Sequence, residues 1–244
     1  MNLKYIIKPW KWNNVFISFG ENCVADDILR RYRLKSFTTP YSHGRTNIEY
    51  ILQGEKDRFA SFLDTSKMDY AICDNKQVVR LNVYTDYSNK YESTCINGVE
   101  FTHHDVKGNE EIRNTFKRRV ERLLKSYSRN LFLFYYHRYC PDTNEELLLE
   151  HLRELKEIYQ SRNKGNVNVI MFTQEIVGKK EERHLEYRTV EVMGTEIHVF
   201  KFHTLNIWQG SNDEIFWGRC DDDLIHEMIK IISYEFKLPG GFLL

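Results

Sequence analysis

Three nearly continuous apolar runs, spread widely along the chain, most constrain what this sequence can fold into. They occupy residues 15–19, 131–136 and 167–172 and are rich in aromatic and β-branched side chains. Such runs are typical of strands that are covered on both faces, as in a parallel sheet. Amphipathic segments alternate with these runs. The pattern therefore predicts an α/β fold with a largely parallel, three-layer sheet of the SGNH or Rossmann type.

The amphipathic segments predict the helices. Residues 109–127 form the clearest helical pattern, with an apolar stripe opposite Lys and Arg side chains. Thr46 is the expected cap of a short helix, and Thr143 and Glu146 form a capping-box pattern at the start of another. The acidic residues 221–223 favour the N-terminus of a last helix.

Antiparallel hairpins are expected as decorations of the sheet. Residues 189–193 and 196–202 alternate around a glycine turn, which predicts one hairpin. The pair Asn97-Gly98 predicts a second, tight hairpin, and a further strand is expected at 78–84. Since the chain has no repeat, low-complexity tract or linker, we expect all 244 residues to form one domain.

Composition excludes several classes of protein. Lys and Arg total 35, as do Asp and Glu, so no global field attracts nucleic acid. The odd number of cysteines and the absence of CxxC spacing argue against a zinc knuckle or a disulfide framework and for free thiols in a reducing compartment. No run is long enough to span a membrane. We therefore expect a soluble, cytoplasmic protein. The cysteines are Cys23, Cys73, Cys95, Cys140 and Cys220.

Cys23 is the candidate nucleophile. Gly20 permits a sharp turn after the first strand, and Asn22 is the expected N-cap of the helix that follows. Cys23 is then expected in the first helical turn, where the helix dipole favours a thiolate of low pKa. Asn22 and the backbone N–H of Cys23 are expected to stabilise an oxyanion. The alternative is a half-buried structural cysteine.

Histidines that follow predicted strands are the candidate bases, because reacting groups gather at the carboxyl ends of strands. His104 fits this role, with Asp105 orienting its imidazole. The alternative is a solvated turn over 103–105 in which Asp105 caps the next helix. Adjacent histidines seldom bind one ion, so no metal site is expected. His137 and Arg138 follow the second apolar run, and Arg138 is a candidate substrate contact.

Two further patterns supply secondary candidates. Asp223 and His226 have the Asp-x-x-His spacing that supplies acid and base in SGNH-type esterases, although any acidic helix start followed by histidine matches it. His203 follows another predicted strand. The sequence contains no P-loop, Rossmann fingerprint or metalloprotease motif, so no resident cofactor is expected.

A polar, aromatic loop over 36–45 has the composition of a specificity loop. Tyr41 and His43 are the candidate substrate contacts in this loop, together with Ser18 and Gly20 at the end of the first strand.

Several short motifs resemble a known bacterial family. Residues 18–23, Ser-Phe-Gly-Glu-Asn-Cys, are similar to the opening Ser-Leu-Gly-x-Asn-Cys of the putative papain-like cysteine peptidases of unknown function. His104-Asp105 and the run Arg-Arg-Val-Glu-Arg-Leu at 118–123 resemble a later His-Asp pair and helix of that family. The resemblance covers residues 14–138. It implies that Cys23 is the nucleophile and His104 the base, with Asp105 close by.

The resemblance has one departure and one functional implication. Where the family has Pro-Phe-Asp-Trp, this chain has Pro40-Tyr41-Ser42-His43, which makes His43 an additional candidate base or substrate contact. The family resembles components of surface-polysaccharide biosynthesis, and the Gly-x-Asn-Cys opening is loosely similar to capsule-associated acetyltransferases. The resemblance thus implies acyl transfer to or from a small molecule or a carbohydrate, with acyl-CoA as a candidate donor. The alternatives are a non-catalytic carbohydrate- or nucleotide-binding module and a scaffolding partner.

Overall fold

A five-stranded sheet forms the centre of the computed structural model, which describes residues 13–73, 75–81, 99–138, 140–210 and 213–238. Four strands run parallel in the order β1-β5-β6-β8, and β7 pairs antiparallel with β8 at the edge. This arrangement confirms the predicted α/β fold with a largely parallel sheet. The strands are β1 (Asn14–Gly20), β5 (Asn130–His137), β6 (Val167–Ile176), β7 (His184–Val192) and β8 (Thr195–Thr204).

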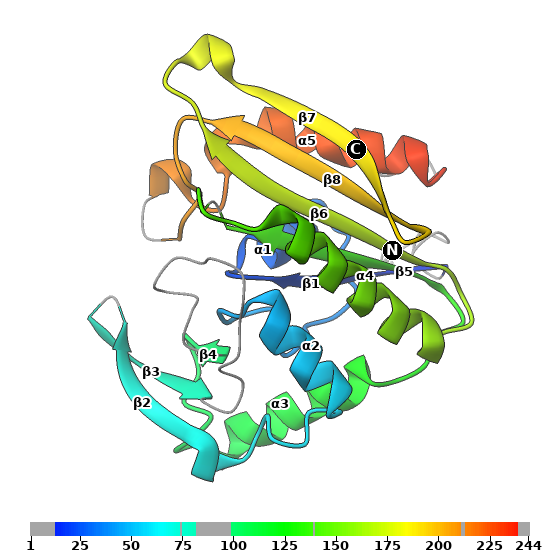
Figure 1. Cartoon of the computed structure of the whole chain (residues 1–244). Coiled ribbons are helices and arrows are strands. Elements are labelled where there is room, and N and C mark those ends of the chain that lie inside the picture. The colour runs from blue at the N-terminus through cyan, green and yellow to red at the C-terminus, as the bar shows by residue number, and fades with distance from the viewer. Residues whose placement is uncertain (1–12, 74, 82–98, 139, 211–212, 239–244) are drawn as a thin grey trace, which may run out of the picture.

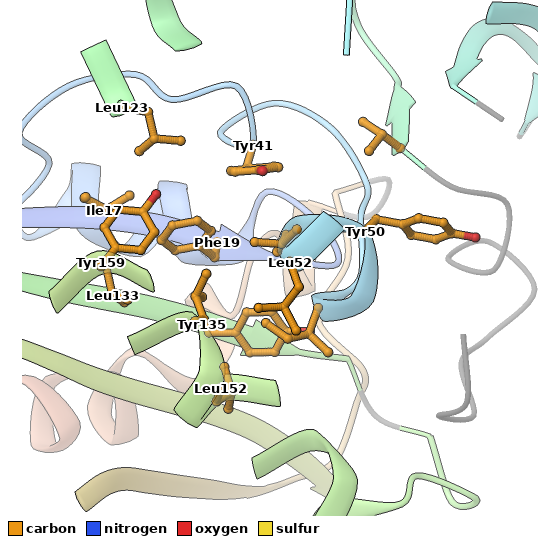
Figure 2. Packing of buried hydrophobic residues seen from close by; sticks show 14 of the residues in the cluster. Ile17, Phe19, Tyr41, Tyr50, Leu52, Leu123, Leu133, Tyr135, Leu152 and Tyr159 are labelled. Atoms are coloured by element: carbon orange, nitrogen blue, oxygen red, sulfur yellow. The ribbon is translucent and has the colours of Figure 1, made fainter. Parts of the chain in front are cut away.

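Helices cover both faces of this sheet and complete three layers (Figure 1). On β1, Ile17 and Phe19 pack into one apolar cluster, whereas Phe16 packs into the other, because successive side chains point to opposite faces. Figure 2 shows the first cluster, in which Phe19 lies against Tyr159 of α4. The helices are α1 (Val24–Arg31) and α5 (Asp222–Glu235) on one face, and α2 (Ile48–Lys56), α3 (Glu110–Leu123) and α4 (Glu145–Arg162) on the other.

A separate three-stranded antiparallel sheet lies beside the first (Figure 1). It contains β2 (Met68–Cys73), β3 (Lys76–Leu81) and β4 (Val99–Phe101). The sequence analysis did not predict β2, in which only Met68 is buried. The expected hairpin at Asn97-Gly98 and the end of the expected strand at 78–84 lie outside the described residues.

The loop before α2 joins the two sheets. The N–H of Arg45 donates to the carbonyl of Glu100 on β4 at 2.9 Å, and the N–H of Glu100 returns a bond at 2.8 Å. The residues before α2 and those after β4 are therefore held next to each other. Short 3-10 turns are found at Thr65–Lys67, Lys180–Glu182, Asp213–Ile215 and Arg219–Asp221.

The predicted helix starts were wrong by one residue. Asn47 caps α2 and Asn144 caps α4, each accepting a backbone N–H three residues on, in place of Thr46 and Thr143. Thr143 uses its hydroxyl to bond the imidazole of His137 instead. Thr143 therefore does not cap α4, because its hydroxyl bonds His137, a residue of β5 that the local spacing does not reveal. The hairpin of β7 and β8 is confirmed, and no described helix is long and apolar enough to cross a membrane.

Candidate active site

The turn from β1 into α1 presents Cys23 at the carboxyl end of the sheet. Gly20 has a φ of 141°, and a Cβ at this position would lie 2.6 Å from the carbonyl oxygen of Tyr136 on β5. Only glycine fits both the backbone conformation and the close approach. The structure thus gives Gly20 a backbone role, which positions residues 21–23 above the ends of β1 and β5.

Glu21 anchors this turn, and the sequence analysis did not single it out. Its side chain is only 1% exposed. One carboxylate oxygen accepts the hydroxyl of Tyr135 at 3.0 Å and lies 2.7 Å from Nδ1 of His137, while the other accepts the N–H of Arg138 at 2.8 Å. The sequence did contain a signal for this role, since Glu21 directly follows a buried strand. A carboxylate buried at that position needs several hydrogen-bond donors, so it is expected to connect neighbouring segments. His137 is therefore occupied as a structural partner of Glu21.

Cys23 is the N-cap of α1 and does not lie in its first turn. The preceding Asn22 accepts the N–H of Val24 through its side-chain oxygen at 2.9 Å. Burial, and next the negative charge of Asp26, raise the pKa of the Cys23 thiol to about 11. The prediction of a thiolate of low pKa was therefore wrong. The helix dipole favours the anion, but desolvation and a carboxylate within the first turn of α1 outweigh it.

A cavity of about 340 Å³ opens onto Cys23. Asn22 and His103 line it, and His103 is the only histidine of the described residues that does so. Three cationic side chains also line the cavity, and no carboxylate of a described residue does. These cations are Arg45, Lys76 and Arg138, and the remaining wall includes Cys73, Thr102, Gln209, Gly210 and Trp217.

His104 and His43 lie next to each other, and neither lines this cavity. Their ring centroids are 6.1 Å apart, and the ring of His104 also contacts Phe116 of α3. Burial, followed by nearby positive charges, lowers the pKa of His43 to about 4 and lowers the pKa values of His103 and His104. All three imidazoles are therefore neutral near pH 7, which is the protonation state that a general base requires.

Asp105 has the geometry of a turn residue. Its carboxylate accepts the N–H of Gly108 at 2.7 Å and the hydroxyl of Tyr70 at 3.1 Å. These bonds fix an exposed turn ahead of α3, as in the structural alternative, but Asn109 and not Asp105 caps that helix, by accepting the N–H of Ile112 at 3.1 Å.

Ser18 and Tyr41 lie beneath the site, and each is 3% exposed. Ser18 donates its hydroxyl to Asp26 at 3.0 Å, and the ring of Tyr41 packs against Phe19. Both side chains are covered by protein, and neither residue lines the cavity of Cys23, so their role as direct substrate contacts stays a prediction. Both support the loop that follows α1.

Residues 14–175 match the family described as putative papain-like cysteine peptidase (DUF1796). The chain belongs to this family. The match confirms the resemblance seen in the sequence, and it contains Cys23, His103 and Arg138. It ends within β6, so the part of the cavity wall that includes Trp217 lies beyond it. No curated protein and no solved structure matches the chain.

The loop that departs from the family motif is tightly held here. Ser42 stands where the resemblance places the family's aspartate, and its hydroxyl bonds Ser18 at 3.3 Å and the N–H of Thr39 at 2.9 Å. Ser42 is completely buried. It connects the loop to β1 in this chain and does not reach the cavity.

The secondary candidates lie on other parts of the molecule. Asp223 pairs with Arg183 at 2.9 Å, and the ring of His226 stacks near that of Tyr32. His203 stacks on His184 in the β7–β8 hairpin with ring centroids 4.0 Å apart. None of the three lines the cavity that contains Cys23.

Proposed function

We propose that this protein is a cysteine-dependent acyl-transfer enzyme, a hydrolase or a transferase, in which Cys23 is the nucleophile and His103 the base. The observation that carries the proposal is a cavity whose lining residues include both Cys23 and His103. Membership of a cysteine-peptidase family supports the same assignment. The choice of His103 replaces the earlier expectation of His104, whose ring faces Phe116 and His43.

The protonation states favour a concerted first step. The pKa of Cys23 is about 11 and that of His103 is lowered, so thiol and imidazole are both neutral before the substrate binds. As the sulfur attacks the acyl carbonyl and the C–S bond forms, the thiol proton passes to His103. The backbone N–H of Cys23 and the side-chain amide nitrogen of Asn22 form no hydrogen bond with another described residue. Both are available to donate to the carbonyl oxygen as it gains negative charge.

The second half of the reaction regenerates the thiol. When the bond to the leaving group breaks, His103 returns the proton to that group, and the acyl chain remains on Cys23 as a thioester. Water or a hydroxyl group of a carbohydrate then attacks the thioester, His103 takes the proton of the attacking group, and the released thiolate is reprotonated. With acyl-CoA as the donor and a carbohydrate hydroxyl as the acceptor, the same steps would serve surface-polysaccharide biosynthesis. None of these steps uses a resident cofactor.

A second candidate function is a non-catalytic binding module for carbohydrates or nucleotides. The raised pKa of the Cys23 thiol favours this candidate, because a protonated thiol is a poor nucleophile. A binding module retains its affinity in Cys23→Ala, whereas an enzyme loses turnover in that variant.

The deciding experiment measures acylation of Cys23 with 4-nitrophenyl acetate and acetyl-CoA, using mass spectrometry for the acyl-enzyme and absorbance for turnover. We expect Cys23→Ala to remove both signals and His103→Ala to slow acylation by about 100-fold or more. His104→Ala is the matched control, since its side chain does not line the cavity. We expect that variant to change the rate less than about threefold. Acylation of wild-type Cys23 no faster than that of free cysteine would refute the proposal.

A further inference from the structure

A second cavity lies at the carboxyl ends of the parallel strands, which is where ligands bind in open α/β sheets. Its volume is about 350 Å³, and it opens between the ends of β5 and β6 and the start of α4. It shares no lining residue with the cavity of Cys23, since His137 lines the second cavity and the next residue, Arg138, lines the first. His137 therefore belongs to a different site from Cys23.

Three side chains are hydrogen-bonded in a row from the protein core to this cavity. Oε1 of Glu21 lies 2.7 Å from Nδ1 of His137, and Nε2 of the same ring lies 2.7 Å from the hydroxyl of Thr143. Glu21 is buried, whereas Thr143 is half-buried and lines the cavity together with His137. A hydroxyl, an imidazole and a carboxylate in this order and at these distances form the arrangement by which hydrolases activate a nucleophile.

The partners of the imidazole determine the direction of its hydrogen bonds. A carboxylate only accepts hydrogen bonds, and that of Glu21 also accepts the hydroxyl of Tyr135 and the N–H of Arg138. The proton of the neutral ring is therefore on Nδ1, so Nε2 accepts a hydrogen bond from the Thr143 hydroxyl. In this tautomer Nε2 can take the Thr143 proton, and the buried carboxylate stabilises the imidazolium that forms.

The start of α4 supplies backbone donors close to Thr143 in the chain. The first N–H groups of this helix, those of Glu145 and Glu146, form no hydrogen bond with another described residue. Glu145 also lines the cavity. Free N–H groups at a helix N-terminus, together with the helix dipole, stabilise a developing negative charge. The cavity thus combines a hydroxyl nucleophile, its base and donors for an oxyanion.

The cavity wall favours an uncharged substrate with an apolar part. Its two carboxylates are both paired: Glu145 pairs with Arg188. Glu175 pairs with Lys201 at 3.3 Å. The remaining wall includes apolar side chains from α4 and β6, namely Leu148, Met171 and Ile176. An apolar acyl chain has matching surface to cover there.

We propose that Thr143 is a second nucleophile, activated by His137 and Glu21, which takes acyl groups from uncharged esters with an apolar acyl chain. This inference goes beyond the proposed function, because it uses neither Cys23 nor its base. As the hydroxyl oxygen bonds to the acyl carbon, its proton passes to Nε2 of the imidazole. The alcohol leaves with that proton, and the acyl group remains on the threonine as an ester. Water then attacks this ester, gives its proton to the imidazole and releases the acid, and the proton returns to the threonine oxygen.

Labelling by diisopropyl fluorophosphate tests the nucleophile without a substrate. The reagent forms a P–O bond to an activated hydroxyl and releases fluoride, while the hydroxyl proton passes to the imidazole. The protein is Cys23→Ala, because Cys23 does not line the second cavity. We expect Thr143 to be labelled at least about 100-fold faster than Thr173, as measured by peptide mass spectrometry. Thr173 lines the same cavity, and its hydroxyl bonds no histidine among the described residues. Equal rates at the two threonines, or no label on Thr143, would overturn the proposal.

Two substitutions separate catalysis from a structural bond between the loop and β5. In the Cys23→Ala background, Thr143→Ser keeps the hydroxyl and should retain labelling and the hydrolysis of 4-nitrophenyl hexanoate. Thr143→Val keeps the shape and should lower kcat by at least about 100-fold. Circular dichroism checks that both variants are folded, and if Thr143→Val is not, the labelling ratio decides alone. Equal kcat values in the two folded variants would show that the hydroxyl only ties the loop to the strand.

The length of the acyl chain tests the substrate class. We expect Cys23→Ala to hydrolyse 4-nitrophenyl hexanoate at least about 100-fold better than the acetate ester, because the longer chain buries more methylene groups. Equal kcat/KM values for the two esters would contradict an apolar acyl site. Since acetyl donors report on Cys23 and Thr143 is tested in its absence, failure of either proposal leaves the other unaffected.

Discussion

One buried carboxylate adds to the effect of burial in raising the pKa of the Cys23 thiol. Asp26 is the largest charge contribution that raises the pKa of Cys23, and it follows burial in size. It stays in place because its two oxygens accept Ser18 at 3.0 Å and Lys35 at 2.7 Å. The network that fixes the loop after α1 therefore also holds a negative charge near Cys23, which adds to the effect of burial on the pKa of the thiol. Arg45 acts in the opposite direction and lowers the pKa.

Asp26→Asn should lower the pKa of Cys23 by about one unit, because the substitution removes a negative charge at nearly constant shape. Alkylation by iodoacetamide near pH 7.5 should then be about threefold faster, less than the tenfold gain in thiolate, since nucleophilicity falls with pKa. The measurement is the pH profile of alkylation at Cys23. Asp27→Asn is the control, because Asp27 contributes less to the pKa and pairs with Arg31 at 2.9 Å. A profile unchanged by Asp26→Asn would contradict this account.

Two ion pairs connect α2 and α4, and their surroundings differ. Arg162 pairs with Glu55 at 2.7 Å, and the Glu55 side chain has no exposed surface. Lys56 pairs with Glu154 at 2.8 Å, with side chains that are 53% and 33% exposed. The hydroxyl of Tyr159 also donates to Glu55 at 2.6 Å. The two N···O distances are similar, but the pair of Arg162 and Glu55 is buried and the pair of Lys56 and Glu154 is exposed. We therefore expect the two pairs to contribute differently to the stability of the protein.

Arg162→Met should destabilise the protein by about 3 to 5 kcal/mol, since the buried carboxylate of Glu55 loses its cation while the aliphatic packing is kept. Lys56→Met should cost less than about 1 kcal/mol, because its pair is exposed and screened. Urea unfolding followed by circular dichroism measures both values. Equal losses in the two variants would show that burial does not distinguish the pairs.

The residues that follow the family match, from 176 onward, complete the central sheet and one of its two apolar layers. β8 pairs with β6 over seven residue positions, and α5 packs on the same face as α1. This face includes completely buried apolar side chains that follow residue 175, among them Phe200, Phe202, Trp208 and Ile225. The family region therefore shares one apolar layer with the C-terminal segment.

A chain truncated after Ile176 should not fold on its own. Each large buried side chain contributes about 1.5 to 3 kcal/mol, so the loss of several exceeds the 5 to 15 kcal/mol by which proteins are usually stable. The uncovered edge of β6 would also expose its backbone groups. Circular dichroism, near-ultraviolet signal and solubility measure the outcome. A soluble fragment with a cooperative thermal transition would contradict this expectation.

The sequence by itself determined the strands of the central sheet and most of the helices that cover it, but not β2 of the smaller sheet. Core strands, the α3 stripe and the β7–β8 hairpin could be predicted because the repeat of apolar residues is local and burial follows from it. The turn of Gly20 and the position of Cys23 at the end of β1 could also be predicted, as could the family, because each depends on a short contiguous motif.

Only the tertiary structure decided which residues line the cavity of Cys23 and how the surroundings shift the pKa of its thiol. Sequence gave no means to choose among the histidines, since His103 and His104 are neighbours in the chain and only His103 lines the cavity of Cys23. The pKa of Cys23 and the anchoring role of Glu21 depend on desolvation and on partners from other segments, such as His137 on β5. Desolvation and charge act through space, and their strength is fixed only when distant segments of the chain meet.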